Sequence, residues 1–348
     1  MTTFLALLNF LLPPATDCYL QPDILDPHTS QELKKISFEV SSDTGISIKD
    51  SQNLLRCIQN NHYTKSRNQS ETASVQPIKG AASKKTPSLF SQFNKRLVDP
   101  YRVKQGVLFY QKYEQILENA ENRFGVDPYV ITAIIGAESN YGRFTGSHII
   151  KDSLATVIAN TPSDVMPPFS IKAKPTRTRK QYFVDQLKAL VKISLKTGFD
   201  IQTLKGSWDG GLGLAQFMPE SYQDYAISSK NHYPDLFDPE DAILSIANYL
   251  AKKGHWKPGP VASLLPDDNH IKTQLGSQQS IPYQAVFNLK DMSPYQDNPD
   301  DIYQFIQADG SSQYWLTYAN FNAIRSYNPR PHYAINIHIL TEAIKQHV

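Results

Sequence analysis

The sequence predicts an α+β protein that is predominantly α-helical, and three kinds of pattern lead to this prediction. Apolar residues recur at helical spacing in several windows between residues 89 and 348. Asp-Pro pairs and single glycines stand where such helices would begin and end. Short β-prone stretches occur where the helical periodicity decays, between 264 and 317. We therefore expect a helical domain with a small, partly β insertion.

Start and stop signals define the individual elements. Asp127-Pro128 and Asp238-Pro239 each combine an N-cap side chain with a proline at the first helical position. Glycines that would close helices are Gly142, Gly198 and Gly254. The expected helices span 107–124, 128–141, 180–197, 219–228, 239–253 and 332–346. The expected strands are 283–289 and 314–317.

Composition divides the chain into four parts. Residues 1–22 form an apolar leader, and residues 23–64 hold a short helical segment whose pattern centres on 46–58. Residues 65–88 are rich in Ser, Thr, Lys, Gln and Ala, which is typical of a flexible linker. Residues 89–348 form the main domain.

The leader indicates export. Its apolar run is too short to span a bilayer but suits the hydrophobic region of a secretory signal, although a basic start is missing. A lipid anchor at Cys18 is weakly signalled because Asp17 stands where a small residue is usual. Cys18 and Cys57 are the only cysteines, so the chain has no disulfide framework and no cysteine zinc site, and a single bridge stays open.

The net charge argues against nucleic-acid binding, and the spacing of the histidines argues against a metal-dependent mechanism. The 35 basic and 33 acidic residues give a net charge of +2, which provides no strong field for nucleic acid. The nine histidines show no metal-ligand spacing, so a metal mechanism is not expected.

Glu138 is the principal catalytic candidate. It ends an apolar stripe formed by Val130, Ile131, Ile134 and Ile135. Burial and the negative end of the helix dipole should raise its pKa, as a general acid requires. The plainer alternative is a solvated glutamate or one paired with Arg143.

Residues 207–219 form a second candidate feature. Three glycines within 210–213 permit positive φ and close approach of a ligand, and Gln216 and Phe217 follow them. The stretch lacks the Lys and Ser/Thr of a phosphate loop, and no strand leads into it as in a dinucleotide site. It is either the wall of a groove or a loose turn.

Five ordered blocks across roughly 89–346 resemble the membrane-bound lytic transglycosylase B family. The blocks are Ile134 to Arg143, Asp152 to Thr156, the glycine loop with Ala215 to Tyr222, Asp238-Pro239 with Ala247 to Tyr249, and Ile324 to Asn328 with Tyr333-Ala334. The resemblance implies a core like that of goose-type lysozyme. It also implies cleavage of the MurNAc-GlcNAc bond of peptidoglycan, leaving a 1,6-anhydromuramoyl end.

The same resemblance implies the site residues. The catalytic glutamate corresponds to Glu138. The substrate-binding residues correspond to Tyr182, Ser207, Gln216, Phe217, Tyr249, Tyr327, Asn328 and Tyr333. The expected binding partner is a peptidoglycan strand, and no nucleic acid is expected. We expect a monomer located in the periplasm or cell envelope. Association with the membrane through the N-terminal segment is left open.

A single carboxyl would have to perform the chemistry. Glycosidases commonly use two carboxyls about 5 to 9.5 Å apart. Asp209 and Asp152 are weak second candidates, because the first lies in the glycine loop and the second is expected to cap or pair. One acid suffices if it protonates the leaving oxygen and then removes a proton from the C6 hydroxyl of the sugar, which attacks C1.

Some positions depart from the family pattern. Phe93 stands where a tyrosine is usual. Ser228, Lys230 and His232 occupy positions where some relatives carry calcium ligands, so we expect no cofactor and regard calcium as poorly supported.

Tyr249 lies near the apolar face of its helix, so core packing is an equal alternative for it. The alternative functions are a hydrolytic muramidase and a non-catalytic peptidoglycan-binding or scaffold protein.

Overall fold

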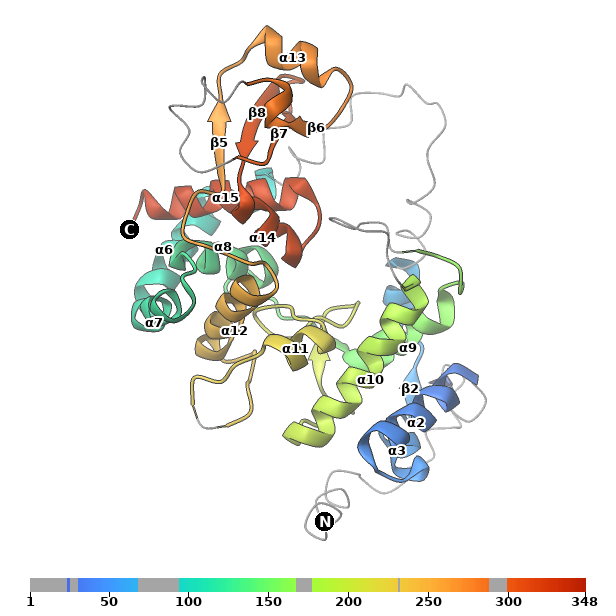
Figure 1. The fold of residues 1–348 in the computed structure, drawn as a ribbon. Helices are drawn as coiled ribbons and strands as arrows, with labels where there is room; N and C mark the ends of the chain where they lie inside the picture. The colour runs from blue at the N-terminus through green and yellow to red at the C-terminus, as the bar shows by residue number, and fades with distance from the viewer. Residues whose placement is uncertain (1–23, 26–30, 68–93, 167–176, 231, 288–298) are drawn as a thin grey trace. The chain divides into compact units, whose positions relative to one another are not determined.

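The computed structural model describes residues 24–25, 31–67, 94–166, 177–230, 232–287 and 299–348. The chain forms two compact units (Figure 1): the first comprises 1–79, 145–168 and 173–224, and the second comprises 80–144, 169–172 and 225–348. The predicted leader with Cys18, Phe93 and most of the predicted linker lie outside the described residues. Among the helices of the described ranges, none has both the length and the apolar character needed to cross a membrane.

Helix α8, Pro128–Ser139, is the central helix of the second unit (Figure 1). Nine of its twelve residues are buried, and the isoleucines at 131, 134 and 135 have no exposed surface. A helix that is apolar on all sides is stable only when other elements surround it. The helices that contact it are α6, Pro100–Lys112; α7, Glu114–Phe124; α12, Pro239–Lys252; and α15, Pro331–Lys345.

The second unit also contains an antiparallel sheet with strand order β5-β8-β7-β6. Its strands are β5, Ala262–Leu265; β6, Ser280–Pro282; β7, Asp301–Ile306; and β8, Ser312–Thr317. Helix α13, Asn269–Leu275, buries Ile271 and Leu275 against side chains of the sheet such as Ile302 and Leu316. Helix α14, Ala319–Tyr327, then leads from the sheet towards α15.

The first unit is built on helices α9, Ile150–Asn160, and α10, Arg179–Thr197. Helix α10 packs on α9 and on the N-terminal helix α2, Gln31–Thr44, which is followed by α3, Ile48–Leu54 (Figure 1). Two short antiparallel pairs complete the unit: β1, Ile24–Leu25, with β2, Ile58–Gln59; and β3, His148–Ile149, with β4, Lys205–Gly206. Helix α11, Pro219–Tyr225, follows the glycine loop.

The predicted mainly helical α+β fold is confirmed, but the single helix over 107–124 is wrong. The chain forms α6 and α7 there, and Tyr113 between them has φ −115° and ψ 21°. Helix α6 also begins earlier than predicted, at Pro100, because Asp99 accepts the backbone N–H of Arg102 at 3.0 Å. This Asp-Pro pair is the same start signal that predicted two other helices.

The strand prediction is half right. Residues 314–317 lie within β8, as predicted, but 283–285 form a 3₁₀ turn and the strand β6 precedes them. Pro282 has no N–H to extend the strand ladder. The chain turns instead, and the backbone N–H of Val286 donates to the carbonyl of Tyr283 at 3.0 Å.

Helices α2, α9, α13 and α14 are not among the predicted helices, and neither are two short helical segments of the described residues, 62–67 and 94–97. Helix α9 begins without a capping side chain, since Ile149 stands at its N-cap position, so the start signal that placed α8 and α12 is missing. Its apolar residues do recur at helical spacing, at positions 150, 154, 157 and 158, but nine of its eleven residues are buried and include polar side chains such as Ser153 and Thr156.

Truncation of a buried isoleucine in α8 should destabilise the second unit strongly. Ile134→Ala leaves a cavity at a position with no exposed surface and should lower the free energy of unfolding by about 2–5 kcal/mol. Urea unfolding followed by circular dichroism measures this. Leu108→Ala on α6, where the side chain is 49% exposed, is the control and should have little effect. Equal effects of the two changes would contradict the central role of α8.

Candidate active site

Glu138 lies in the last turn of α8, immediately before a sharp change of chain direction. The next three residues after Ser139 all have positive φ: 50° at Asn140, 59° at Tyr141 and 84° at Gly142. Left-handed geometry is unfavourable for a residue such as Tyr141, so the surrounding contacts must maintain it. The Ser139 hydroxyl accepts the backbone N–H of Gly142 at 3.0 Å and closes the turn.

The last turn of α8 is also held from outside the helix. Arg102 of α6 donates from its guanidinium to the carbonyl oxygen of Gly136, which also accepts the backbone N–H of the cap residue Asn140 at 3.1 Å. The Tyr141 hydroxyl donates to the carbonyl of Arg102 at 3.0 Å. A side chain at Gly136 would collide with the Tyr141 ring, at 2.6 Å. Arg102 was missed by the sequence analysis, although the Asp99-Pro100 start signal was available.

The carboxyl of Glu138 is half-buried and has a specific donor. The Tyr333 hydroxyl of α15 donates to Glu138 Oε1 at 2.6 Å. Burial, followed by the negative charge of Glu138, raises the pKa of Tyr333 well above its ordinary value. Tyr333 therefore keeps its proton at neutral pH and remains a hydrogen-bond donor to the carboxylate.

Two further predicted tyrosines lie in the same part of the second unit. Burial and then the charge of Glu138 raise the pKa of Tyr327 well above its ordinary value, so the Tyr327 hydroxyl keeps its proton at neutral pH. The Tyr249 ring contacts the Tyr327 ring at 4.9 Å with an angle of 60°. Tyr249 is only 4% exposed, and its hydroxyl donates to the carbonyl of Ser326 at 2.6 Å. Tyr249 therefore lies in the core, and its hydroxyl binds the backbone at the end of α14.

Asn328 closes the connection from α14 to α15. It is the C-terminal cap residue of α14, and its Oδ1 accepts the backbone N–H of Arg330 at 3.3 Å. Helix α15 begins at Pro331, so this short connection determines where Tyr333 lies. The structure therefore assembles five predicted residues in the second unit, from α8, α12 and the α14–α15 region.

The remaining predicted residues belong to the first unit, and three of them shape the glycine loop. Ser207 Oγ donates to Asp209 Oδ1 at 2.6 Å and accepts the backbone N–H of Gly211 at 2.7 Å. A Cβ atom at Gly211 would lie 2.8 Å from Ser207 Oγ and 2.9 Å from Gln216 Oε1. Glycine at this position is thus required by the packing of these two side chains.

Gln216 and Phe217 close the other end of the glycine loop. Gln216 has φ 50°, and its Nε2 donates to the carbonyls of Gly213 at 2.7 Å and Thr145 at 3.2 Å. Phe217 is 2% exposed and pairs through its backbone with Leu212. The loop is an ordered structure closed by its own side chains, so the alternative of a loose turn is wrong.

Tyr182 lies on α10 in the same unit. Burial, and then the negative charge of Asp209, raises its pKa above the ordinary value, so it stays neutral. The Arg177 guanidinium lies 4.7 Å from the centre of its ring. Arg177 also forms ion pairs with Asp185 at 2.6 Å and Glu220 at 2.7 Å. This network fixes the start of α10 and of α11 around Tyr182.

The two weak carboxylate candidates are both engaged. Asp152 forms a buried ion pair with Lys151 Nζ at 2.9 Å. Burial raises the pKa of Asp152 and lowers that of Lys151, and the pairing opposes both shifts. Asp209 accepts the Ser207 hydroxyl, as described above. These contacts give each carboxylate a structural role.

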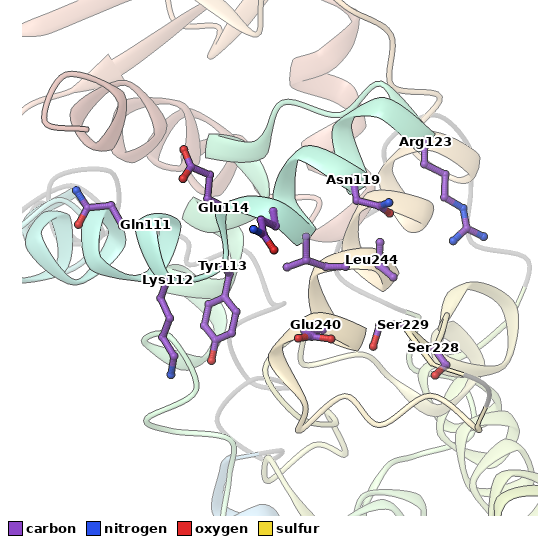
Figure 2. A pocket seen from close by; sticks show the side chains of 12 residues that line it. Gln111, Lys112, Tyr113, Glu114, Asn119, Arg123, Ser228, Ser229, Glu240 and Leu244 are labelled. Atoms are coloured by element: carbon purple, nitrogen blue, oxygen red, sulfur yellow. The ribbon is translucent and has the colours of Figure 1, made fainter.

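A cavity of about 790 Å³ lies elsewhere in the second unit, between α7, α12 and the loop at 228–229 (Figure 2). Its lining carries charges of both signs, from Lys112, Arg123, Glu114 and Glu240. None of the predicted site residues is among its lining residues. The cavity is therefore separate from the group of residues around Glu138.

The loop after α11 contains the positions considered for calcium. Asp241 is fully buried, and its two carboxylate oxygens accept the backbone N–H groups of Ser229 at 2.6 Å and Asp235 at 2.7 Å. Lys230 Nζ lies 3.4 Å from Asp238 and 3.8 Å from Glu240. Across the described residues, no group of three or more His, Cys, Asp or Glu side chains is arranged to hold a metal ion.

Comparison with known proteins assigns the family. A transglycosylase SLT domain model matches residues 29–342. Membrane-bound lytic murein transglycosylase B from Escherichia coli is 31% identical over 280 residues, which cover 80% of this chain and 72% of that protein. The structure of E. coli lytic transglycosylase Slt35 in complex with calcium matches with a TM-score of 0.71 and 25% identity, covering 95% of this chain and 99% of that one.

Soluble lytic transglycosylase SltB1 from Pseudomonas aeruginosa has the same fold, with a TM-score of 0.72 at 24% identity over 91% of this chain and 99% of that one. The five ordered blocks, the mainly helical fold and these matches agree. The chain therefore belongs to the transglycosylase SLT domain family of lytic transglycosylases.

Proposed function

We propose that this enzyme cleaves the β-1,4 bond between MurNAc and GlcNAc in peptidoglycan and forms 1,6-anhydroMurNAc, with Glu138 as general acid and then base. The observation that carries the proposal is the 2.6 Å hydrogen bond from the Tyr333 hydroxyl to Glu138 Oε1. Family membership supports it, because the E. coli relative is named for its action on murein.

Tyr333 gives the carboxyl of Glu138 a fixed orientation. Since Tyr333 keeps its proton, it donates to Oε1 whether Glu138 is ionised or protonated. In the protonated state the acidic hydrogen then lies on Oε2, the oxygen that does not accept from Tyr333. A positioned proton of this kind contributes to general acid catalysis through both orientation and proximity.

The proposed reaction conserves protons without water. Glu138 gives its proton to the glycosidic oxygen as the bond from that oxygen to C1 breaks. The resulting carboxylate removes the proton of the C6 hydroxyl, and the C6 oxygen forms a new bond to C1. Tyr333 assists the first step, in which Glu138 becomes ionised, because a hydrogen bond donated to a carboxylate stabilises the ionised form.

The remaining predicted residues have different roles in this proposal, which depend on how deeply each side chain is buried. Tyr327 and Tyr182 are half-buried, so each can present part of a ring face and a neutral hydroxyl to a sugar. Phe217 in the first unit and Tyr249 in the second are nearly fully buried, so each supports the predicted site residues of its own unit. Ser207 and Gln216 keep the glycine loop closed, so that its backbone groups are held ready for the N-acetyl group.

The location of the enzyme follows from its substrate. We infer that the protein works in the cell envelope as a monomer, with the leader directing export.

We also propose that the enzyme requires no calcium. The carboxylate of Asp241 is already occupied by two backbone N–H groups, and Lys230 supplies a positive charge to Asp238 and Glu240. Calcium prefers six to eight oxygen ligands, and a lysine ammonium in the loop offers none. The residues of this loop therefore do not fit the ion that Slt35 holds.

Glu138→Gln should abolish formation of anhydro products from purified sacculi. The amide has no acidic proton to give and is not basic enough to accept one, so turnover should fall at least about a hundredfold while the melting temperature is retained. Mass spectrometry of the digests measures this, with Glu342→Gln at an exposed position of α15 as the control. Undiminished anhydro product from Glu138→Gln would refute the assignment.

The same digests separate the alternative functions. A muramidase that uses water would give reducing ends, which are one water heavier than anhydro ends. A binding protein would retain glycan without any cleavage by the wild type.

Tyr333→Phe should shift the pH profile of the enzyme. Removal of the donor destabilises the ionised form of Glu138, so the pKa of Glu138 should rise relative to the wild type. Glu138 then stays protonated to higher pH, and the alkaline limb of the kcat/KM profile should move upwards. Tyr318→Phe is the control, because Tyr318 is equally buried but its hydroxyl lies 3.4 Å from Ser263 Oγ. An unchanged limb would contradict the proposed interaction.

Chelation should leave the protein unchanged. A calcium ion at a hundred times its Kd would contribute about 2.7 kcal/mol, and its removal would lower the melting temperature by at least about 2 °C. We expect no such shift when protein treated with EDTA is compared with protein in calcium chloride. Lys230→Asp is the matched variant, because it replaces the internal cation by a carboxylate and should introduce a calcium response. A calcium response in the wild type would refute the proposal.

A further inference from the structure

A short helical turn over residues 62–67 connects the N-terminal part of the chain to the first unit's glycine loop. Asn61 begins this turn, and its Oδ1 accepts the backbone N–H of Thr64 at 3.0 Å, as an N-cap residue does. The Nδ2 of the same side chain donates to Ser153 Oγ at 3.3 Å and lies 3.1 Å from His148 Nδ1. One amide thus caps the turn and joins it to α9 and β3.

Thr64 makes the contact with the glycine loop. Its side chain has no exposed surface, and Oγ1 donates to the carbonyl oxygen of Trp208 at 2.8 Å, across 144 residues of sequence. The Arg67 guanidinium lies 5.5 Å from the centre of the Trp208 ring. Because the Thr64 hydroxyl is buried, water cannot replace its hydrogen bond to the Trp208 carbonyl if the side chain is changed.

Trp208 stands at the position where such a contact can control the loop. It follows Ser207, whose hydroxyl closes the loop on Gly211. Gly206, one residue earlier, pairs with His148 across β3 and β4, and the Tyr63 ring stacks on His148 at 5.2 Å. Residues 61–67 therefore hold the start of the loop at two successive points.

The chain that precedes the turn is anchored in the same way. Lys151 of α9 is 2% exposed, and its Nζ donates to the carbonyls of Arg56 at 3.1 Å and Cys57 at 3.2 Å while pairing with Asp152. A buried ammonium is stable only with such a set of acceptors. These bonds fix the path of the chain into Asn61.

We propose that Thr64 is a positioning residue for the glycine loop, and that residues 61–67 belong to the scaffold of the glycan-binding site. Thr64 holds the Trp208 carbonyl so that Ser207 and the loop backbone keep the shape that binds the glycan. This inference rests on the proposed function, because it assumes that the loop binds substrate. Thr64 contacts no reacting atom.

The test compares Thr64→Val, which removes the hydroxyl at nearly constant volume, with Thr64→Ser, which restores it. Thr44→Val is the matched control, since the Thr44 hydroxyl bonds only within its own helix, to the carbonyl of Val40. On soluble, uncrosslinked peptidoglycan strands we expect Thr64→Val to raise KM roughly three- to tenfold, the range that one lost hydrogen bond gives, with kcat changed less than about twofold. Hydrogen exchange should increase over residues 205–218, and Thr64→Ser should restore both values.

Asn61→Asp covers the case in which Thr64→Val does not fold. Aspartate keeps the capping oxygen and loses the donor to Ser153 and His148, so it should also raise KM and exchange in the loop. Wild-type KM and wild-type exchange in a folded Thr64→Val or Asn61→Asp protein would overturn the inference. If the wild type itself forms no anhydro product, the proposed function fails, and that outcome is distinguishable because it does not depend on Thr64.

Discussion

The burial of helix α8 is the constraint on which the second unit depends. A helix that is apolar on every side cannot lie at the surface, so α6, α7, α12 and α15 must enclose it. Glu138 is the one residue of this helix that carries a charge, and it lies in the last turn, where the enclosure ends. The packing that stabilises the second unit therefore also determines the half-buried position of the Glu138 carboxyl.

Two polar groups at this helix end take partners from neighbouring elements, each for a physical reason. Arg102 from α6 supplies a cation to the carbonyl of Gly136, where the helix dipole is negative. Tyr333 from α15 supplies a neutral hydroxyl to Glu138, which a buried carboxyl needs as a partner. The left-handed residues after Ser139 then take the chain away from the carboxyl. Stability and the proposed chemistry use the same contacts.

The glycine loop follows a different principle. It contains little regular secondary structure, so side chains reinforce the few backbone hydrogen bonds that hold its shape, such as the one from Leu212 to Phe217. Ser207 and Gln216 each bond to backbone groups of the loop, and the glycines provide the space those side chains occupy. Helix α9 and the turn at 61–67 support this loop within the first unit. The sequence gives no role to residues 61–67, but in the structure they contact the glycine loop of the proposed binding site.

The sequence by itself determined the features that depend on neighbouring residues. The Asp-Pro signals placed the starts of α8 and α12, the apolar stripe placed Glu138 at the end of a buried helix, and the glycines marked an unusual loop. Local patterns failed where a helix has no capping side chain to mark its start, as in α9, and where one residue interrupts a helical run, as at Tyr113. Only the tertiary structure decided that Tyr333 meets Glu138 and that Thr64 meets Trp208. These pairs lie 195 and 144 residues apart, and periodicity carries no information about contacts over such separations.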